Sequence, residues 1–154
     1  MNNSMSMIIP VLSPEWKVEV TFRLTGPIIQ GHCSLFHLTQ GGNFENYGDR
    51  VPAAFVYDPQ LDLKVRSDLN GIPNGLNAPV LKISRNTTYH LEVNQRYISA
   101  GNYRLSYLLN GENIISVINQ QAEQFYGVRV YSGGTPWYQT CSGTIKNFKI
   151  TNFL

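Results

Sequence analysis

The nine residues from Trp16 to Leu24 alternate strictly between apolar and polar side chains. The apolar set is Trp16, Val18, Val20, Phe22 and Leu24, and the polar set is Lys17, Glu19, Thr21 and Arg23. Successive side chains of an extended strand point to opposite faces, so this pattern predicts a strand with one face on the core and the other in water. A helix would bring Lys17 and Glu19 against the core. The stretch therefore predicts an antiparallel sheet that is solvated on one side.

Short strand-like runs recur along the rest of the chain, and turn residues separate them. The runs are 7–12, 33–38, 53–57, 61–69, 80–83, 88–98, 103–109, 114–118, 125–131 and 145–153. Asn110-Gly111 lies between two of these runs and predicts a hairpin, because both central residues of a type I′ turn need positive φ. Only residues 120–124 suggest a helical turn. Short strands at regular spacing favour a two-sheet antiparallel β-sandwich or a barrel.

Length and composition indicate one domain and limit the classes of partner. The 154 residues are typical of one domain, so we expect residues 1–154 to form a single sandwich in which residues 1–7 are flexible. Charged residues make up 14% of the chain and the net charge is +2, with the cations scattered. This argues against a nucleic-acid partner. No apolar run is long enough for membrane insertion.

The polar but weakly charged composition favours a secreted or extracellular protein. Residues 1–7 lack the basic segment and apolar run of a signal peptide, so we expect a mature domain. Cys33 and Cys141 would form a disulfide in an oxidising compartment and stay free thiols in the cytosol. Two cysteines give no spacing pattern, and two separate buried side chains remain the alternative. The sequon at Asn86 lies between two expected strands and predicts N-glycosylation.

The loop from Gly41 to Pro52 differs most from strand-forming sequence. It concentrates carboxylates, amides, glycines, aromatic rings and an arginine, and loops on a rigid scaffold are where binding residues concentrate. Carboxylate and amide oxygens are preferred ligands of Ca²⁺, so the loop predicts a calcium site with Glu45 and Asp49 as ligands. The alternative is that Asp49 and Arg50 form a structural ion pair or cap the loop backbone. The spacing of an EF-hand is absent.

A second loop, residues 133–140, adds exposed aromatic candidates. Aromatic rings can stack on the apolar faces of sugars, and amide and guanidinium groups can bond their hydroxyls. The residues that we predict to bind a sugar are Asn43, Phe44, Tyr47, Arg50, Trp137 and Tyr138. The alternative for Trp137 is that it plugs the end of the sandwich, since large aromatic side chains are usually buried.

Several short motifs, taken in order, resemble the concanavalin A-like lectin/glucanase superfamily, in particular its laminin G-like and pentraxin-like jelly rolls. The motifs are Trp16-x-Val18-x-Val20-x-Phe22, residues 34–38, residues 47–53, Tyr89-x-Leu91-x-Val93, residues 107–112, Val128-x-Val130-Tyr131 and Gly143-x-Ile145-x-Asn147-Phe148. The resemblance implies a jelly roll whose first and last strands lie side by side. It also implies binding of glycans or matrix proteins, often with Ca²⁺. Laminin G-like calcium sites draw on a second acidic loop, for which Asp68 and Asn70 are the nearest match.

These patterns lead to one expected function and one alternative. We expect a non-enzymatic, extracellular, lectin-like carbohydrate-binding module that Ca²⁺ assists. The alternative is a protein–protein adhesion or structural module of laminin G-like fold. Glucanases of this fold carry two catalytic carboxylates on one strand, and no strand here has that spacing. The expected partner is thus a glycan or an extracellular protein, and homo-oligomerisation stays open.

Overall fold

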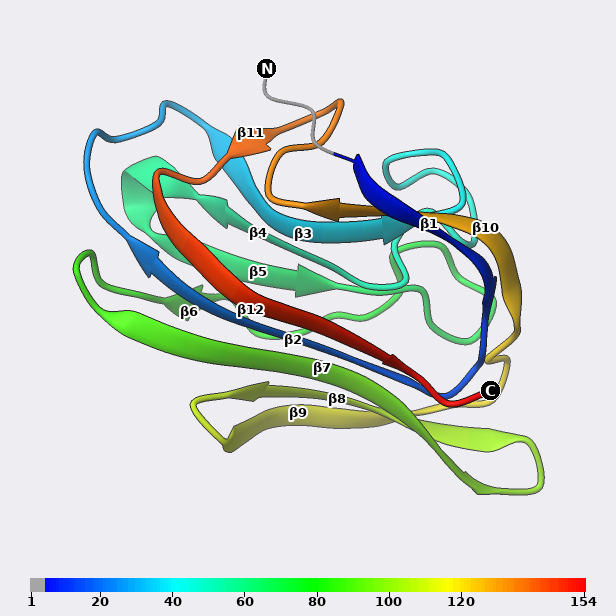
Figure 1. Ribbon diagram of the computed structural model, residues 1–154. Helices are drawn as coiled ribbons and strands as arrows, with labels where there is room; N and C mark the ends of the chain where they lie inside the picture. Colours follow the sequence, from blue (N-terminus) through cyan, green and yellow to red (C-terminus); the bar gives the residue numbers. More distant parts are fainter. Residues whose placement is uncertain (1–4) are drawn as a thin grey trace.

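The computed structural model describes residues 5–154, which form two β-sheets packed face to face (Figure 1). The larger sheet has the order β1-β10-β3-β4-β5-β6, and β11 pairs with β3 off this path. Its strands are β1 (Met5–Leu12), β3 (His32–Thr39), β4 (Ala53–Tyr57), β5 (Asp62–Arg66), β6 (Leu81–Lys82), β10 (Phe125–Ser132) and β11 (Gln139–Thr140). Every pair in this sheet is antiparallel except β11 with β3. The expected β-sandwich is confirmed.

The smaller sheet is antiparallel throughout and has the order β12-β2-β7-β8-β9. Its strands are β2 (Trp16–Leu24), β7 (Thr88–Ser99), β8 (Asn102–Leu109), β9 (Glu112–Asn119) and β12 (Gly143–Asn152). Asn110 and Gly111 have φ of 51° and 79°, which is the backbone that the predicted hairpin turn between β8 and β9 requires.

The core lies between the two sheets. Val18 and Val20 of β2 are fully buried, whereas Lys17, Glu19 and Thr21 lie on the partly exposed face of this strand. Leu35 and Leu38 of β3 face them from the other sheet as part of the same buried cluster. The strict alternation of β2 is therefore the signature of a sheet with one buried face.

The structure differs from two local expectations. Met5 to Met7, which we expected to be flexible, belong to β1 and pair with β10; residues 1–4, of which the same was expected, lie outside the described part of the chain. Residues 120–124 form no helical turn. The first two backbone N–H groups have side-chain partners instead: Gln120 donates to Asn70 Oδ1 at 2.7 Å and Gln121 to Asn119 Oδ1 at 3.1 Å.

The strands β1 and β12 lie at the same side of the sandwich, but as the edges of different sheets. β1 pairs with β10, and β12 pairs with β2 (Figure 1). Asn152 of β12 joins the two edges: its Nδ2 donates to the carbonyl of Val11 at 2.9 Å, and its Oδ1 accepts the N–H of Ser13 at 2.9 Å. The first and last strands are thus neighbours through side chains and not through a shared ladder.

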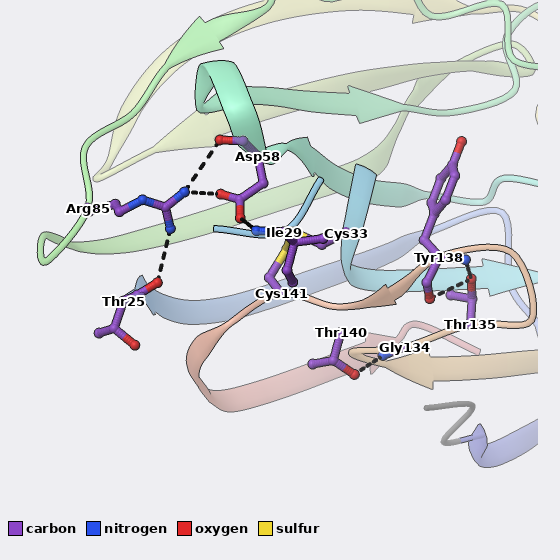
Figure 2. Close-up of a disulfide and its surroundings, with 10 residues drawn as sticks. All are labelled: Thr25, Ile29, Cys33, Asp58, Arg85, Gly134, Thr135, Tyr138, Thr140 and Cys141. Carbon is purple, nitrogen blue, oxygen red and sulfur yellow. Dashed lines mark hydrogen bonds and ion pairs between the residues drawn. A yellow bond between two sulfur atoms is a disulfide. The ribbon is translucent and has the colours of Figure 1, made fainter. Parts of the chain in front are cut away.

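Cys33 of β3 and Cys141, which directly follows β11, form a disulfide (Figure 2). Both residues are buried. The bond fixes the end of the loop 133–140 to the central strand of the larger sheet. Within residues 5–154, no helix is long and apolar enough to span a membrane.

Candidate functional site

Asp49 organises the loop that follows β3. Its Oδ1 accepts the N–H of Gly42 at 3.1 Å, and its Oδ2 accepts the N–H of Asn46 at 2.8 Å. Its backbone carbonyl accepts a hydrogen bond of 2.6 Å from Nε2 of His37. Because Asp49 is only 4% exposed, its carboxylate is committed to the loop backbone. This is the capping role that the sequence left as an alternative.

Arg50 is also buried and holds the loop from the other side. Its guanidinium donates to the carbonyl of Asn43 at 3.0 Å, to Asn43 Oδ1 at 3.2 Å and to Asn74 Oδ1 at 3.1 Å. It also lies 4.7 Å from the ring centre of Phe55 and 5.6 Å from that of Phe44. Among the described residues, no carboxylate forms an ion pair with Arg50. Of the two alternatives left open by the sequence, the Asp49–Arg50 ion pair does not form, and Arg50 supports the loop.

The two loops singled out in the sequence meet around one open depression of about 380 Å³. Its lining is Gly41, Gly42, Asn43, Phe44, Glu45, Asn46, Asp49 and Trp137. Phe44 is 49% exposed, and Trp137 is partly exposed. Trp137 therefore does not plug the end of the sandwich. Three of the predicted sugar-binding residues, Asn43, Phe44 and Trp137, lie together here.

The indole ring of Trp137 packs on aromatic rings of the sheet, and hydrogen bonds hold the turn at residues 135–138. Its ring centre lies 5.2 Å from that of His37 and 6.4 Å from that of Tyr131. Thr135 Oγ1 accepts the N–H groups of Trp137 and Tyr138 at 3.1 and 2.9 Å. The N–H of Thr135 donates to the carbonyl of Tyr138 at 2.8 Å. These bonds and the disulfide (Figure 2) hold the ring in place before any ligand arrives.

Tyr138 and Tyr47 do not line the depression. Tyr138 stacks on His32 with ring centres 5.2 Å apart and contacts Phe55 at 5.5 Å, so it lies beside the depression over β3 and β4. Tyr47 donates its hydroxyl to the carbonyl of Gln121 at 2.9 Å and packs on Phe125. Tyr47 thus has a structural role, and its role in sugar binding stays a prediction.

The loop does not fit the predicted calcium site. Both oxygens of the Asp49 carboxylate already accept N–H groups, which leaves Glu45 as the exposed carboxylate of the depression. Within residues 5–154, no group of three or more His, Cys, Asp or Glu side chains could hold a metal ion. A Ca²⁺ ion needs six to eight oxygen ligands. No step of the function proposed below depends on a metal.

The second acidic loop is structural as well. The buried carboxylate of Asp68 accepts the N–H groups of Gly48 and of Asn74, the latter at 2.8 Å. Burial raises the pKa of Asp68 to about 6. Asn70 uses its side chain to hold Gln120 and the end of β9. Both residues thus join loops to one another.

Asn86 lies in the connection between β6 and β7, with a left-handed backbone at φ of 59°. Its side chain is exposed, and its backbone N–H donates to the carbonyl of Leu24 at 2.7 Å. A glycan on this side chain would extend into solvent.

Sequence reasoning missed the residues of β5 that continue the site. Lys64 and Arg66 alternate with the buried Leu63 and Val65, so they point to the outer face of the larger sheet, where Tyr138 also lies. The alternation was readable in the sequence. The closeness of Lys64 to the loop 133–140 could not be predicted, because that loop follows β5 by more than sixty residues. The two are connected through His32 of β3, which contacts both Tyr138 and Lys64.

In sequence, the chain matches no protein-family profile and no curated protein. Its fold is nevertheless shared with solved structures. Alginate lyase Aly36B superposes with a TM-score of 0.57 at 13% identity, over 99% of this chain and 76% of its own. A heptameric SAP-like pentraxin from Limulus polyphemus gives 0.56 at 13% identity, over 95% of this chain and 67% of its own. An alginate lyase from Pseudomonas aeruginosa gives 0.55 at 14% identity, over 90% and 64%.

These likenesses establish the class of fold: the chain is a jelly-roll β-sandwich. The resemblance drawn from the sequence motifs is confirmed at that level. Two of these three neighbours are lyases and the third is a pentraxin. A fold does not imply one function, so the role of this chain has to be argued from its own side chains.

Proposed function

We propose that this chain is a non-enzymatic, extracellular carbohydrate-binding module whose sugar lies in the depression between Trp137 and the loop 41–46. The observation that carries the proposal is the meeting of a partly exposed indole ring with Phe44 and Asn43 around one open depression. Ligand sites of this kind are concave, with apolar walls and a few polar groups that fix orientation. A sugar ring offers one apolar face for the indole and hydroxyls for the amide.

The rigidity of both walls supports binding. Trp137 is fixed by Thr135, by the disulfide and by the His37 ring, and the opposite wall is fixed by Asp49. A site that is ordered before binding loses less conformational entropy when the ligand arrives. The two loops thus form a binding site that is ordered before the ligand binds.

The chemistry of the depression supports binding without catalysis. Glycosidases use two carboxyl groups that flank the scissile bond. Here the Asp49 carboxylate accepts two backbone N–H groups, and Glu45 is the other carboxylate of the lining. His37 lies beneath the site, but its Nε2 donates to a carbonyl and burial lowers its pKa to about 4. Among residues 5–154, the lining of the depression therefore provides no acid–base pair for catalysis.

The disulfide supports an extracellular location, because such bonds persist in oxidising compartments. Glycans of cell surfaces and matrices are available there. The same location suits the exposed sequon at Asn86.

The proposal is tested on a glycan microarray, followed by isothermal titration calorimetry with the sugars that bind. We expect Trp137→Ala to abolish binding, and Tyr97→Ala to leave it unchanged. Tyr97 is a matched control because it is 52% exposed and belongs to the other sheet. A chelator should have no effect. Wild-type affinity in Trp137→Ala, or cleavage of alginate into unsaturated products, would overturn the proposal.

A protein–protein adhesion module is the second candidate, because the β1 edge is apolar. Met7, Ile9 and Pro10 line a groove of about 270 Å³ together with Phe148 and Ile150 of β12. Met7 and Ile8 are each 51% exposed. Exposed edge strands are templates for pairing with another chain. This candidate predicts self-association in analytical ultracentrifugation that Ile8→Lys abolishes while sugar binding persists.

A further inference from the structure

Two cationic side chains of β5 stand on the outer face of the larger sheet. Lys64 lies opposite Phe55 of β4, and Arg66 lies opposite Ala53. On the next strand, β3, Ser34 and His37 continue the same two rows. The two cations are therefore two residues apart on one face. Trp137 and Tyr138 of the loop 133–140 pack on His37 and Phe55, which belong to the same two rows.

Neither cation has an acidic partner among the described residues. Lys64 donates to Nε2 of His32 at 3.2 Å, and Arg66 donates only to the carbonyl of Val65 on its own strand, at 2.9 Å. Arg66 is partly buried, and burial lowers its pKa. A partly buried charge is normally paired. A guanidinium without a carboxylate partner is therefore suited to an anion from outside.

The acidic groups nearby do not pair with Lys64 or Arg66. Asp62, the next outward residue of β5, is paired with Lys82 at 2.6 Å. Asp49 and Asp68 are buried, and their carboxylates accept backbone N–H groups. The outer face of β5 thus carries two cations that form no ion pair within residues 5–154.

Lys64 and Arg66 lie next to the candidate sugar site. Trp137 lines the depression, and Tyr138, the next residue, stacks on His32 at 5.2 Å. The same His32 ring lies 5.0 Å from that of Tyr57 and accepts the hydrogen bond of Lys64. Contacting rings therefore lead from Tyr138, beside the depression, to Lys64. Arg66 lies in the row of Ala53 and His37, and the ring of Trp137 packs on His37.

We propose that the ligand site extends from Trp137 across Tyr138 and His32 to Lys64 and Arg66, and that it takes an acidic glycan whose carboxylate or sulfate groups pair with these two cations. The rings would carry the sugar faces, and the cations would select for charge. The guanidinium fork of Arg66 suits a planar carboxylate or a sulfate. This extension rests on the proposed sugar-binding function and names the class of sugar.

The test uses pairs of polymers with the same sugar backbone, of which one carries acidic groups and the other is neutral. Polygalacturonate is compared with its methyl ester, and dextran sulfate with dextran, by calorimetry with the full chain. We expect one charged polymer to bind at least about tenfold more tightly than its neutral counterpart, because hydrogen bonds to an ionised group are roughly twice as strong as those between neutral groups. The first pair reports a carboxylate ligand and the second a sulfate ligand. The preference should weaken as salt is added.

Variants assign the preference to β5. Lys64→Gln and Arg66→Gln should each remove most of the charge preference, and Arg66→Lys should retain part of it. Lys146→Gln and Lys149→Gln are the matched controls, because both side chains are exposed on β12 of the other sheet. Melting temperatures verify that each variant folds. Should Arg66→Gln fail to fold, Lys64→Gln still decides.

The two proposals fail in different ways. Equal affinity for charged and neutral polymers, with Trp137→Ala abolishing both, overturns the acidic specificity and leaves sugar binding intact. Equal binding of single-stranded DNA with the same sensitivity to Lys64→Gln would mean unspecific attraction of polyanions, which also overturns it. Absence of binding to every glycan defeats the proposed function itself.

Discussion

The carboxylate of Asp68 accepts a hydrogen bond from the backbone N–H of Gly48, which lies 20 residues earlier in the chain. Its other oxygen accepts the N–H of Asn74 at 2.8 Å. One buried side chain thus ties the loop of the candidate sugar site to the turn after β5. The position of the loop depends on a group whose ionisation changes near neutral pH.

Stability should depend on pH through Asp68. Burial raises its pKa from 3.8 to about 6, so the folded chain binds this proton more tightly than the unfolded chain does. The resulting stabilisation is complete below about 3.8 and is lost as the pH rises through about 6. Relative to Asp68→Asn, the wild type should therefore gain about 1–3 kcal/mol between about pH 7.5 and about pH 4. Urea unfolding measures this difference.

His37 acts in the opposite direction, which is why the comparison with Asp68→Asn is needed. Burial lowers the pKa of His37 from 6.5 to about 4. Its contribution to stability is present above 6.5 and is lost as the pH falls toward about 4. The His37 contribution is common to the wild type and the variant, so it cancels in their difference. A difference that stays constant with pH would contradict the role given to Asp68.

Asp49→Asn should destabilise the fold. The carboxylate accepts two N–H groups, and an amide would turn an NH₂ group toward one of them. An unsatisfied buried donor costs about 1–3 kcal/mol. Chemical denaturation measures the loss, and Glu45→Gln in the same loop serves as the control because Glu45 is exposed. Equal stability of the two variants would argue against Asp49 as the organiser of the loop.

Removal of the disulfide should lower stability strongly. It closes a loop of 108 residues, and a cross-link of that span contributes about 4–5 kcal/mol in the chain-entropy view. The double substitution Cys33→Ala with Cys141→Ala should therefore lower the melting temperature and also weaken sugar binding, because Cys141 ends the loop of Trp137. Scanning calorimetry and titration follow the two effects. An unchanged melting temperature would mean that packing alone holds the loop.

Secretion from a eukaryotic host should place a glycan on Asn86. The side chain is exposed and lies outside the strands, so an oligosaccharide would meet no neighbouring sheet. Intact-mass measurement should show the added mass, and both Asn86→Gln and Thr88→Ala should remove it. Asn2-Asn3-Ser4 is a second match to the sequon, and Asn2→Gln separates the two sites. A mass equal to that of the bare chain would exclude modification at Asn86.

Alternation and turn residues were sufficient to predict most of the fold. β2 and β4 have the predicted bounds. The hairpin at Asn110-Gly111 was predictable because its turn needs positive φ at both central residues, which Asn and Gly adopt readily. β11 was not predictable, because two residues with no periodicity pair with β3 only where the disulfide brings them. The short 3₁₀ helix at Asp58–Gln60 also escaped prediction.

The candidate site was predictable in composition and not in geometry. The sequence singled out the loops of Asn43 and Trp137, and they do meet. It could not separate exposed side chains from structural ones: Arg50 and Tyr47 have the chemistry of sugar ligands, but their hydrogen bonds go to the protein. Which partner a polar group finds depends on neighbours that are distant in the chain.

The hydrogen bonds of the Asn152 side chain, which join the β1 and β12 edges, have a consequence for folding. The hydrogen bonds of this side chain join residues 139 and 141 positions apart, and β12 reaches β2 across nearly the whole sequence (Figure 1). Contacts of such range cannot guide the early events of folding. Chains dominated by non-local pairs fold on the order of milliseconds to seconds. Before β12 pairs with β2, the backbone of β2 has an unpaired edge. Partly folded chains with such an edge are prone to aggregate.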